Sequence, residues 1–112
     1  MKKGEVWRVR IPFAPGHAQS GERPAIIVQE DTFIQSLPTV LIVPFTSSMG
    51  AARFEGTLVV TPDGQNGLTV PSVALVFQAR ALDKGHCLRQ QGTLSQLTMD
   101  QVVAILGKLI GK

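Results

Sequence analysis

Val40-Leu41-Ile42-Val43-Pro44-Phe45 is an apolar run that passes directly into three consecutive hydroxyl side chains, Thr46-Ser47-Ser48. Its richness in Val and Ile predicts a strand over residues 39–46, in the middle of a closed or covered sheet. Pro44 lacks a backbone donor, so we expect it at an edge, at a bulge or near the end of that strand. A strand that stops there would present Thr46 outward.

A second apolar run, residues 25–29, follows the polar loop Gly16-His17-Ala18-Gln19-Ser20-Gly21-Glu22-Arg23-Pro24. The loop delivers Arg23 immediately before this predicted strand. An arginine fixed between a loop and a rigid strand can hold an anion in one geometry. If the two strands are neighbours, Arg23 and the hydroxyls of residues 46–48 can converge on one phosphate.

Period-two patterns dominate the rest of the chain. Apolar and basic side chains alternate over residues 7–11, which predicts a first strand with one buried and one wet face, although Val6 departs from the alternation. Further strands are predicted over residues 56–61 and 72–78. The Asp-Gly and Asn-Gly pairs within residues 62–67 predict that these two strands form a hairpin.

The C-terminal segment changes to helical spacing, and Thr98-Met99-Asp100-Gln101 offers a capping box with an acid in the first turn. We therefore expect a helix over residues 99–110. Several short strands and one terminal amphipathic helix predict a mainly β fold, a small and strongly bent antiparallel barrel with the helix packed against it.

Composition limits the classes of protein that this chain can represent. The 112 residues, 44% of them hydrophobic and 17% charged, predict a single domain over residues 1–112. A net charge of +3 without a continuous basic tract mildly favours an anionic partner. No apolar stretch approaches the roughly 20 residues that span a bilayer, so we expect no membrane partner and a cytoplasmic location.

Metal ligands are sparse in the sequence. Only His17, His86 and Cys87 are soft or borderline ligands, and the adjacent pair His86-Cys87 lacks the spacing of zinc sites. Gly64 and Gly67 are not followed by the Gly-Lys-Ser/Thr of a P-loop. The sequence therefore predicts no metal and no cofactor.

The segments GHAQSGERPAIIVQ (16–29) and VPFTSS (43–48) resemble the MazF/PemK family of toxin endoribonucleases. The likeness continues in order through Lys3-Gly4-Glu5-Val6-Trp7, Gly67-Leu68, Gln78-Ala79-Arg80 and Leu94-Ser95. The resemblance implies the SH3-like barrel of MazF-type and CcdB-type toxins, which are homodimers. It also implies a cognate antitoxin partner whose acidic, disordered tail lies across an RNA groove.

The same resemblance implies a sequence-specific, metal-independent cleavage of single-stranded RNA that leaves a 2′,3′-cyclic phosphate and a 5′-hydroxyl. Attack by the 2′-hydroxyl needs a base, an acid and stabilisation of the phosphoryl oxygens. By family position, Arg23 and Thr46 are the catalytic pair, and Ser47 donates to the same oxygens. His17 matches a histidine used in the PemK branch, and an imidazole suits proton transfer near neutrality.

Departures from the family bear on the proton transfers. Phe77 stands where many members carry an acid, and Leu75 replaces an arginine of the PemK branch. Phe77 either packs in the core or stacks an unpaired base. The residues expected to contact RNA are Gln19, Ser48, Arg53, Phe77, Gln78 and Arg80.

Two alternative functions stay open at this stage. One is a protein-targeted inhibitor like the gyrase-poisoning CcdB group, although those toxins act through a C-terminal end that contains tryptophan. Here the only tryptophan is Trp7, and the chain ends Leu109-Ile110-Gly111-Lys112. The other is a catalytically inactive RNA-binding relative, which the missing acid at position 77 keeps in consideration.

Overall fold

The computed structural model describes residues 1–12 and 20–112. Antiparallel strands dominate these residues, and the chain closes with a helix, as predicted. The strands are β1 (Glu5–Ile11), β2 (Gly21–Ile27), β3 (Thr39–Thr46), β4 (Thr57–Val60), β5 (Ser72–Leu75), β6 (Arg80–Asp83) and β7 (Cys87–Thr93). The helices are α1 (Asp31–Ile34), α2 (Gln96–Leu109) and the 3₁₀ turns η1 (Met49–Arg53), η2 (Val76–Gln78) and η3 (Lys84–His86).

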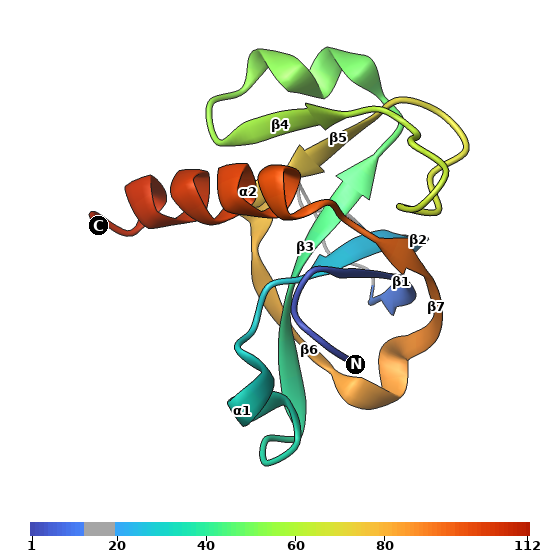
Figure 1. Ribbon diagram of the computed structural model, residues 1–112, viewed down its shortest axis with the longest axis vertical. Helices are drawn as coiled ribbons and strands as arrows, with labels where there is room; N and C mark the ends of the chain where they lie inside the picture. Colours follow the sequence, from blue (N-terminus) through green and yellow to red (C-terminus); the bar gives the residue numbers. More distant parts are fainter. Residues whose placement is uncertain (13–19) are drawn as a thin grey trace.

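Strand β3 is the centre of the sheet, whose order is β4-β5-β3-β2-β1-β7, with β6 also paired to β3. The first half of β3 pairs with β6, and its last two residues, Phe45 and Thr46, pair with β5. Pro44 sits between these two pairings, opposite Ala25 of β2. A residue without a backbone donor fits there, near the end of the strand, where β3 changes partners. In Figure 1, β3 runs from beside β6 in the lower part of the view to beside β5 in the upper part.

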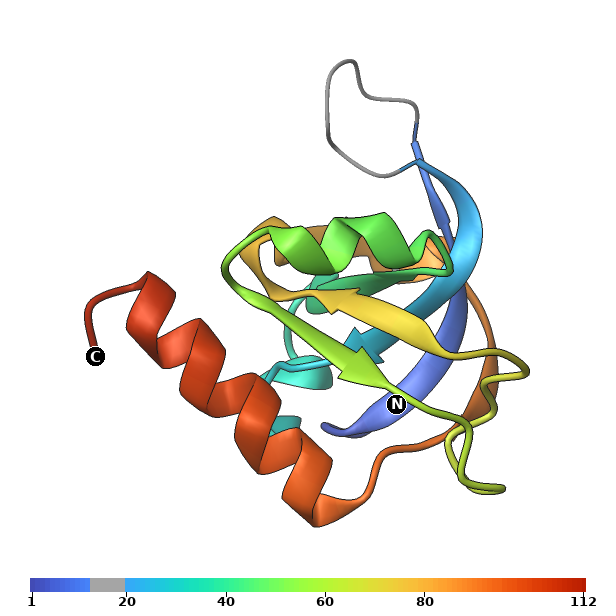
Figure 2. The ribbon, with the colours of Figure 1, turned by 90° about the horizontal axis from the view of Figure 1, so that it is seen from above.

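Two groups of buried side chains stabilise the bent sheet. One lies among β1, β2, β3 and β6 and includes Val9 and Ile42. The other joins β3, β4 and β5 to the first half of α2, where Met99 and Val102 are buried. Figure 2 shows α2 lying obliquely beside the β4–β5 pair, with its C-terminal turns projecting away from the sheet. Burial of such apolar faces is the main favourable contribution to a fold of this size.

Strand β1 does not keep the simple alternation that the sequence suggested. Val6 and Val9 are both fully buried, whereas Trp7 is only partly buried. The register against β7 shifts between Val6 and Trp7 and again between Arg8 and Val9. Such bulges re-aim side chains, which explains why Val6 departs from the pattern.

Element boundaries correct three further predictions. Strand β2 covers Gly21–Ile27 rather than residues 25–29, so Arg23 lies within the strand and not before it. The strand predicted over residues 72–78 ends at Leu75 and continues as η2. Helix α2 begins at Gln96 rather than residue 99, because Ser95 is its N-cap and its side chain accepts from the backbone of Thr98 at 3.2 Å. Strands β6 and β7 were not predicted, since the sequence of β7, CLRQQGT, is mostly polar and lacks an apolar stripe.

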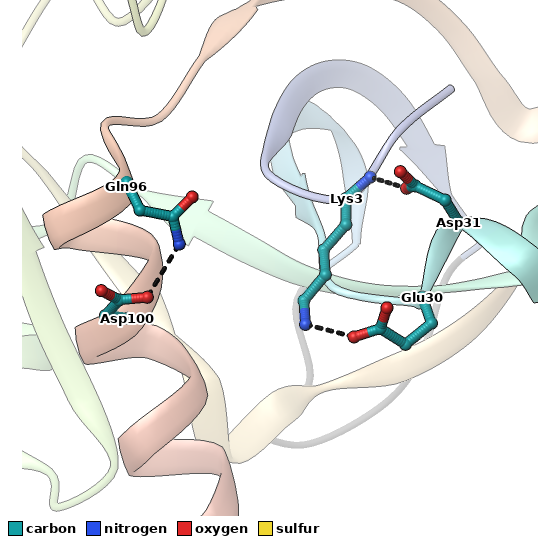
Figure 3. A network of polar contacts seen from close by, with 5 residues as sticks. All are labelled: Lys3, Glu30, Asp31, Gln96 and Asp100. Atoms are coloured by element: carbon teal, nitrogen blue, oxygen red, sulfur yellow. Dashed lines mark hydrogen bonds and ion pairs between the residues drawn. The ribbon is translucent and has the colours of Figure 1, made fainter.

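Polar contacts fix the N-terminal turn beside the start of α1. The Lys3 backbone donates to Asp31 Oδ1 at 2.7 Å, and Lys3 Nζ lies 2.6 Å from Glu30 Oε1 (Figure 3). The same figure shows Gln96 donating to Asp100 one turn along α2. Exposed ion pairs of this kind add little stability, about 0–1 kcal/mol each, so they orient the turn more than they hold the fold. No helix within the described residues has the length and apolar character needed to cross a membrane.

Candidate active site

A cleft of about 290 Å³ opens where β2 begins and β3 ends. Arg23, Thr46 and Ser47, three of the residues predicted to be catalytic, line it together. Residues 67–70 and Gln91 of β7 also contribute to the lining. The predicted meeting of the two segments is therefore present in the structure, and it follows from the pairing of β2 with β3.

Hydrogen bonds to the backbone of both segments fix the Arg23 guanidinium. Its Nε and Nη2 donate to the Ser20 carbonyl at 3.1 and 2.8 Å, and its Nη1 donates to the Phe45 carbonyl at 3.0 Å. A guanidinium carries five N–H donors, so each terminal nitrogen keeps one hydrogen beyond these bonds. Two remaining donors on neighbouring nitrogens match the bidentate geometry of a phosphate.

The charge of Arg23 is uncompensated by any ion pair among the described residues. Partial burial, together with the positive charge of Arg8, lowers the pKa of the Arg23 guanidinium. Arginine nevertheless stays protonated in proteins. A partly buried cation with unused donors is suited to binding an anion rather than to accepting a proton.

Thr46 lies in the cleft lining rather than outward on the surface as expected. Only 8% of the residue is exposed, and its backbone pairs with Val73 of β5. Its Oγ1 accepts from the backbone of Ser48 at 3.2 Å, which leaves the hydroxyl hydrogen to donate. Ser47 beside it is exposed. An alcohol donor therefore stands on β3, next to the carbonyl that holds Arg23.

The wall opposite β2 is a tight turn anchored by its own side chains. Asp63 Oδ1 accepts from the backbones of Gln65 and Asn66, both at 2.9 Å, and these bonds lower the pKa of Asp63. Asn66, which is 1% exposed, donates to the Thr61 carbonyl and accepts from the Leu68 backbone. The predicted Asp-Gly and Asn-Gly signals thus shape the loop between β4 and β5, and residues 67–70 of that loop form a wall of the cleft.

Among the lining residues that the sequence did not indicate as site residues, three carry a charged or amide side chain: Arg8, Glu22 and Gln91. Arg8 Nε lies 3.6 Å from Glu22 Oε1, and Arg10 Nη2 lies 3.4 Å from Glu22 Oε2. The alternation of arginines over residues 7–11 was the available signal for Arg8, whereas Glu22 meets the arginines only through the pairing of β1 with β2. Nothing in the local sequence of β7 indicates Gln91, which enters the cleft only through the pairing of β7 with β1.

The described residues predicted to contact RNA lie away from the lining of this cleft. Ser48 precedes η1, and Arg53 ends it with the guanidinium 4.5 Å above the Phe54 ring. Phe77 is 36% exposed in η2, with its ring 5.6 Å from that of Phe54. Gln78 ends η2 and Arg80 begins β6. His17 and Gln19 lie outside the described residues.

Comparisons with known proteins identify the family of this chain. Residues 2–110 match the family described as PemK-like, MazF-like toxin of type II toxin-antitoxin system. The chain is 31% identical to the endoribonuclease MazF of Staphylococcus saprophyticus over 91% of this chain and 84% of the relative. It is 30% identical to the endoribonuclease PemK of Escherichia coli over 98% of this chain and 82% of the relative.

Solved structures give the same result for the fold. MazF of Deinococcus radiodurans superposes with a TM-score of 0.83 at 23% identity, covering 100% of this chain and 97% of that one. The MazE-MazF structure from the same organism gives a TM-score of 0.73 at 26% identity, covering 99% and 96%. The fold is therefore the MazF-like arrangement of an antiparallel sheet with a C-terminal helix.

The chain belongs to the PemK/MazF family of type II toxin-antitoxin toxins. The relatives that establish this membership are endoribonucleases, which confirms the family and the enzyme class predicted from the sequence.

Proposed function

We propose that this protein is the toxin of a toxin-antitoxin pair and cleaves single-stranded RNA at specific sequences without a metal ion. The observation that carries the proposal is the pair of unused N–H groups on Arg23 beside the Thr46 hydroxyl, in one cleft. Such a constellation suits the stabilisation of charge on phosphoryl oxygens.

In the proposed reaction, the ribose 2′-hydroxyl attacks the adjacent phosphorus. The O2′–P bond forms, the P–O5′ bond breaks, and the products carry a 2′,3′-cyclic phosphate and a 5′-hydroxyl. Arg23 holds two phosphoryl oxygens bidentately, while Thr46 and Ser47 donate to the charge that develops on them. His17 carries a proton, the role that its match to the PemK branch implies.

The RNA extends beyond the cleft in this proposal, over the residues predicted to contact it. Phe54 and Phe77 expose 37% and 36% of their surfaces, and Arg53 stacks on Phe54. Aromatic and guanidinium planes of this kind stack unpaired bases in single-stranded recognition. Phe77 is neither fully buried nor isolated, which supports the stacking role more than the core role.

In this proposal the protein forms a homodimer, as the family does, and an acidic segment of the antitoxin holds the homodimer inactive. A net charge of +3 favours association with such a segment. The exposed apolar side chains at the end of α2, Leu109 and Ile110, are 47% and 67% exposed and offer surface for a protein partner.

Incubation of the purified protein with a long RNA in the presence of EDTA tests the function. Defined cuts with 5′-hydroxyl ends, absent from an Arg23→Ala variant, are the expected result. Binding without cuts indicates the inactive relative, and the absence of both indicates the inhibitor. Against the inhibitor, Trp7 is on β1 and donates to Glu5 at 2.9 Å, far along the chain from the C-terminal end that CcdB-like toxins use.

A further inference from the structure

Glu22 lies in the same cleft as Arg23 and Thr46, and the mechanism above gives it no role. Within residues 1–12 and 20–112 it is the one carboxylate that lines the cleft, beside the cations Arg8 and Arg23. A negative side chain weakens the binding of a phosphodiester through charge repulsion. Its position in an anion-binding cleft therefore needs a reason other than substrate affinity.

The chemistry leaves one proton transfer without a residue. Transesterification requires one group that accepts the 2′-hydroxyl proton and another that donates to the leaving 5′-oxygen. Arg23 stays protonated and Thr46 is an alcohol, so neither accepts a proton readily. Position 77, where many relatives have an acid, is phenylalanine. His17 can serve only one of the two transfers at a time.

We propose that the Glu22 carboxylate is the general base of the reaction. It accepts the 2′-hydroxyl proton while that oxygen bonds to the phosphorus held by Arg23 and Thr46. The P–O5′ bond then breaks, and the 5′-oxygen takes a proton from His17. This assignment rests on the endoribonuclease function proposed above.

The contacts of Glu22 fit a carboxylate that is oriented and still available. One oxygen lies 3.6 Å from Arg8 Nε and the other 3.4 Å from Arg10 Nη2. Both separations exceed the roughly 2.7–2.9 Å of a tight charge-assisted hydrogen bond. The Glu22 side chain is 43% exposed, so a substrate can reach it. Glu22 pairs with Arg10 across β1 and β2, so the sheet holds the backbone that also carries Arg23.

A purely structural role for Glu22 predicts a different outcome from a catalytic one. If Glu22 only holds Arg8 and Arg10 in place, its removal disturbs substrate binding and cleavage together. If Glu22 takes the proton, its removal slows the chemical step, while the loss of a negative charge leaves RNA binding equal or tighter. Binding and cleavage then change in opposite directions.

The test compares wild type, Glu22→Gln and Asp100→Asn on a short RNA that spans a mapped cut. Single-turnover cleavage reports the chemical step, and affinity is measured with the same RNA carrying 2′-deoxyribose at the attacking nucleotide. For Glu22→Gln we expect cleavage at least about 100-fold slower, with undiminished affinity. Asp100→Asn loses the same charge outside the cleft lining and should cleave like wild type.

A Glu22→Asp variant adds a second measurement, because it keeps a carboxylate but withdraws it by one methylene. Its cleavage rate should fall between those of wild type and Glu22→Gln. Wild-type cleavage by Glu22→Gln overturns the assignment, and so does a parallel loss of affinity and rate. A wild-type protein that makes no cuts overturns the nuclease function itself, which separates that failure from a failure of Glu22.

Discussion

The guanidinium of Arg23 donates to the carbonyl of Phe45 at 3.0 Å, so the cation on β2 is tied to the residue that precedes Thr46 on β3. The register agrees with this bond, because Ala25 pairs with Pro44 and the same antiparallel alignment brings Arg23 level with Thr46. A charge and a hydroxyl are thus held as one unit by the sheet, before any substrate binds. Pre-organisation of this kind avoids reorganisation during the reaction.

Replacement of Arg23 by lysine should abolish most cleavage although the positive charge remains. Lysine is a point charge and cannot hold the Ser20 and Phe45 carbonyls while gripping two phosphoryl oxygens. We expect a loss of about 100- to 1000-fold in the cleavage rate, the scale of removing one stabilising donor. Single-turnover cleavage measures it, and thermal unfolding reports whether the fold persists. A lysine variant with wild-type activity contradicts bidentate binding.

Thr46→Val removes one hydroxyl from a nearly isosteric side chain. The donor to the phosphate disappears, and so does the acceptor that holds the Ser48 backbone at 3.2 Å. Cleavage should slow by about 100-fold, while Thr46→Ser should retain it. Thr57→Val is the matched control, because Thr57 donates to the Phe54 carbonyl outside the cleft lining. Equal losses in the two valine variants would refute a specific role for the Thr46 hydroxyl.

Gly67→Ala should destabilise the protein more than Gly64→Ala, although both glycines have positive φ. Both substitutions force alanine into the left-handed region, at φ +75° and +85° respectively, which costs about 1–2 kcal/mol. A Cβ on Gly67 would also lie 2.3 Å from the Gln91 carbonyl oxygen, whereas one on Gly64 meets nothing within 4 Å. We expect about 3 kcal/mol or more of lost unfolding free energy for Gly67→Ala.

Urea unfolding of both alanine variants checks this difference. Gly67 lines the cleft, so the same variant should also lose cleavage activity. Similar stabilities for the two variants would show that Gly67 does not pack tightly against Gln91 of β7 in solution.

His17→Ala tests the remaining proton carrier. If the imidazole donates to the 5′-oxygen, the variant should cleave about 100-fold more slowly near neutral pH, and an activated leaving group should restore much of the rate. A 5′-thiolated linkage at the mapped cut supplies such a leaving group. Unchanged cleavage of the natural RNA across pH 5 to 8 would eliminate the role of His17.

Elements with strong apolar patterns could be predicted from the sequence, whereas elements that form only by pairing with another strand could not. The bounds of β3, Thr39–Thr46, match the predicted range because a nearly continuous apolar run ends at the hydroxyls. Strand β7 was missed because its residues are polar and mostly exposed or half-buried. Strand β7 forms by pairing with β1, and the residues of β7 alone do not indicate that pairing.

The same distinction applies to the site. Arg23, Thr46 and Ser47 were predicted because they flank strong strand signals and match a family pattern. Glu22 was missed because the sequence does not show that β1 presents Arg8 and Arg10 to it. Side chains that meet across strands are visible only once the register is known.

Asp63, in the turn beside the cleft, should make the free energy of unfolding depend on pH in the acid range. Two backbone N–H groups donate to its carboxylate and lower its pKa in the folded state, since ionised oxygen accepts more strongly. A group whose folded pKa is depressed stabilises the fold above its unfolded pKa, about 3.9 for aspartate, and that contribution is lost as the pH falls through the folded value.

Asp63→Asn is the matched comparison, because the amide oxygen accepts from the same backbones but does not titrate. Wild type should be more stable than Asp63→Asn at neutral pH, and the difference should shrink as the pH drops below about 4. Urea unfolding of both proteins at several pH values between 7 and the acid limit of the fold measures it. A stability difference that stays constant over this range would mean that the two backbone bonds do not favour the ionised carboxylate.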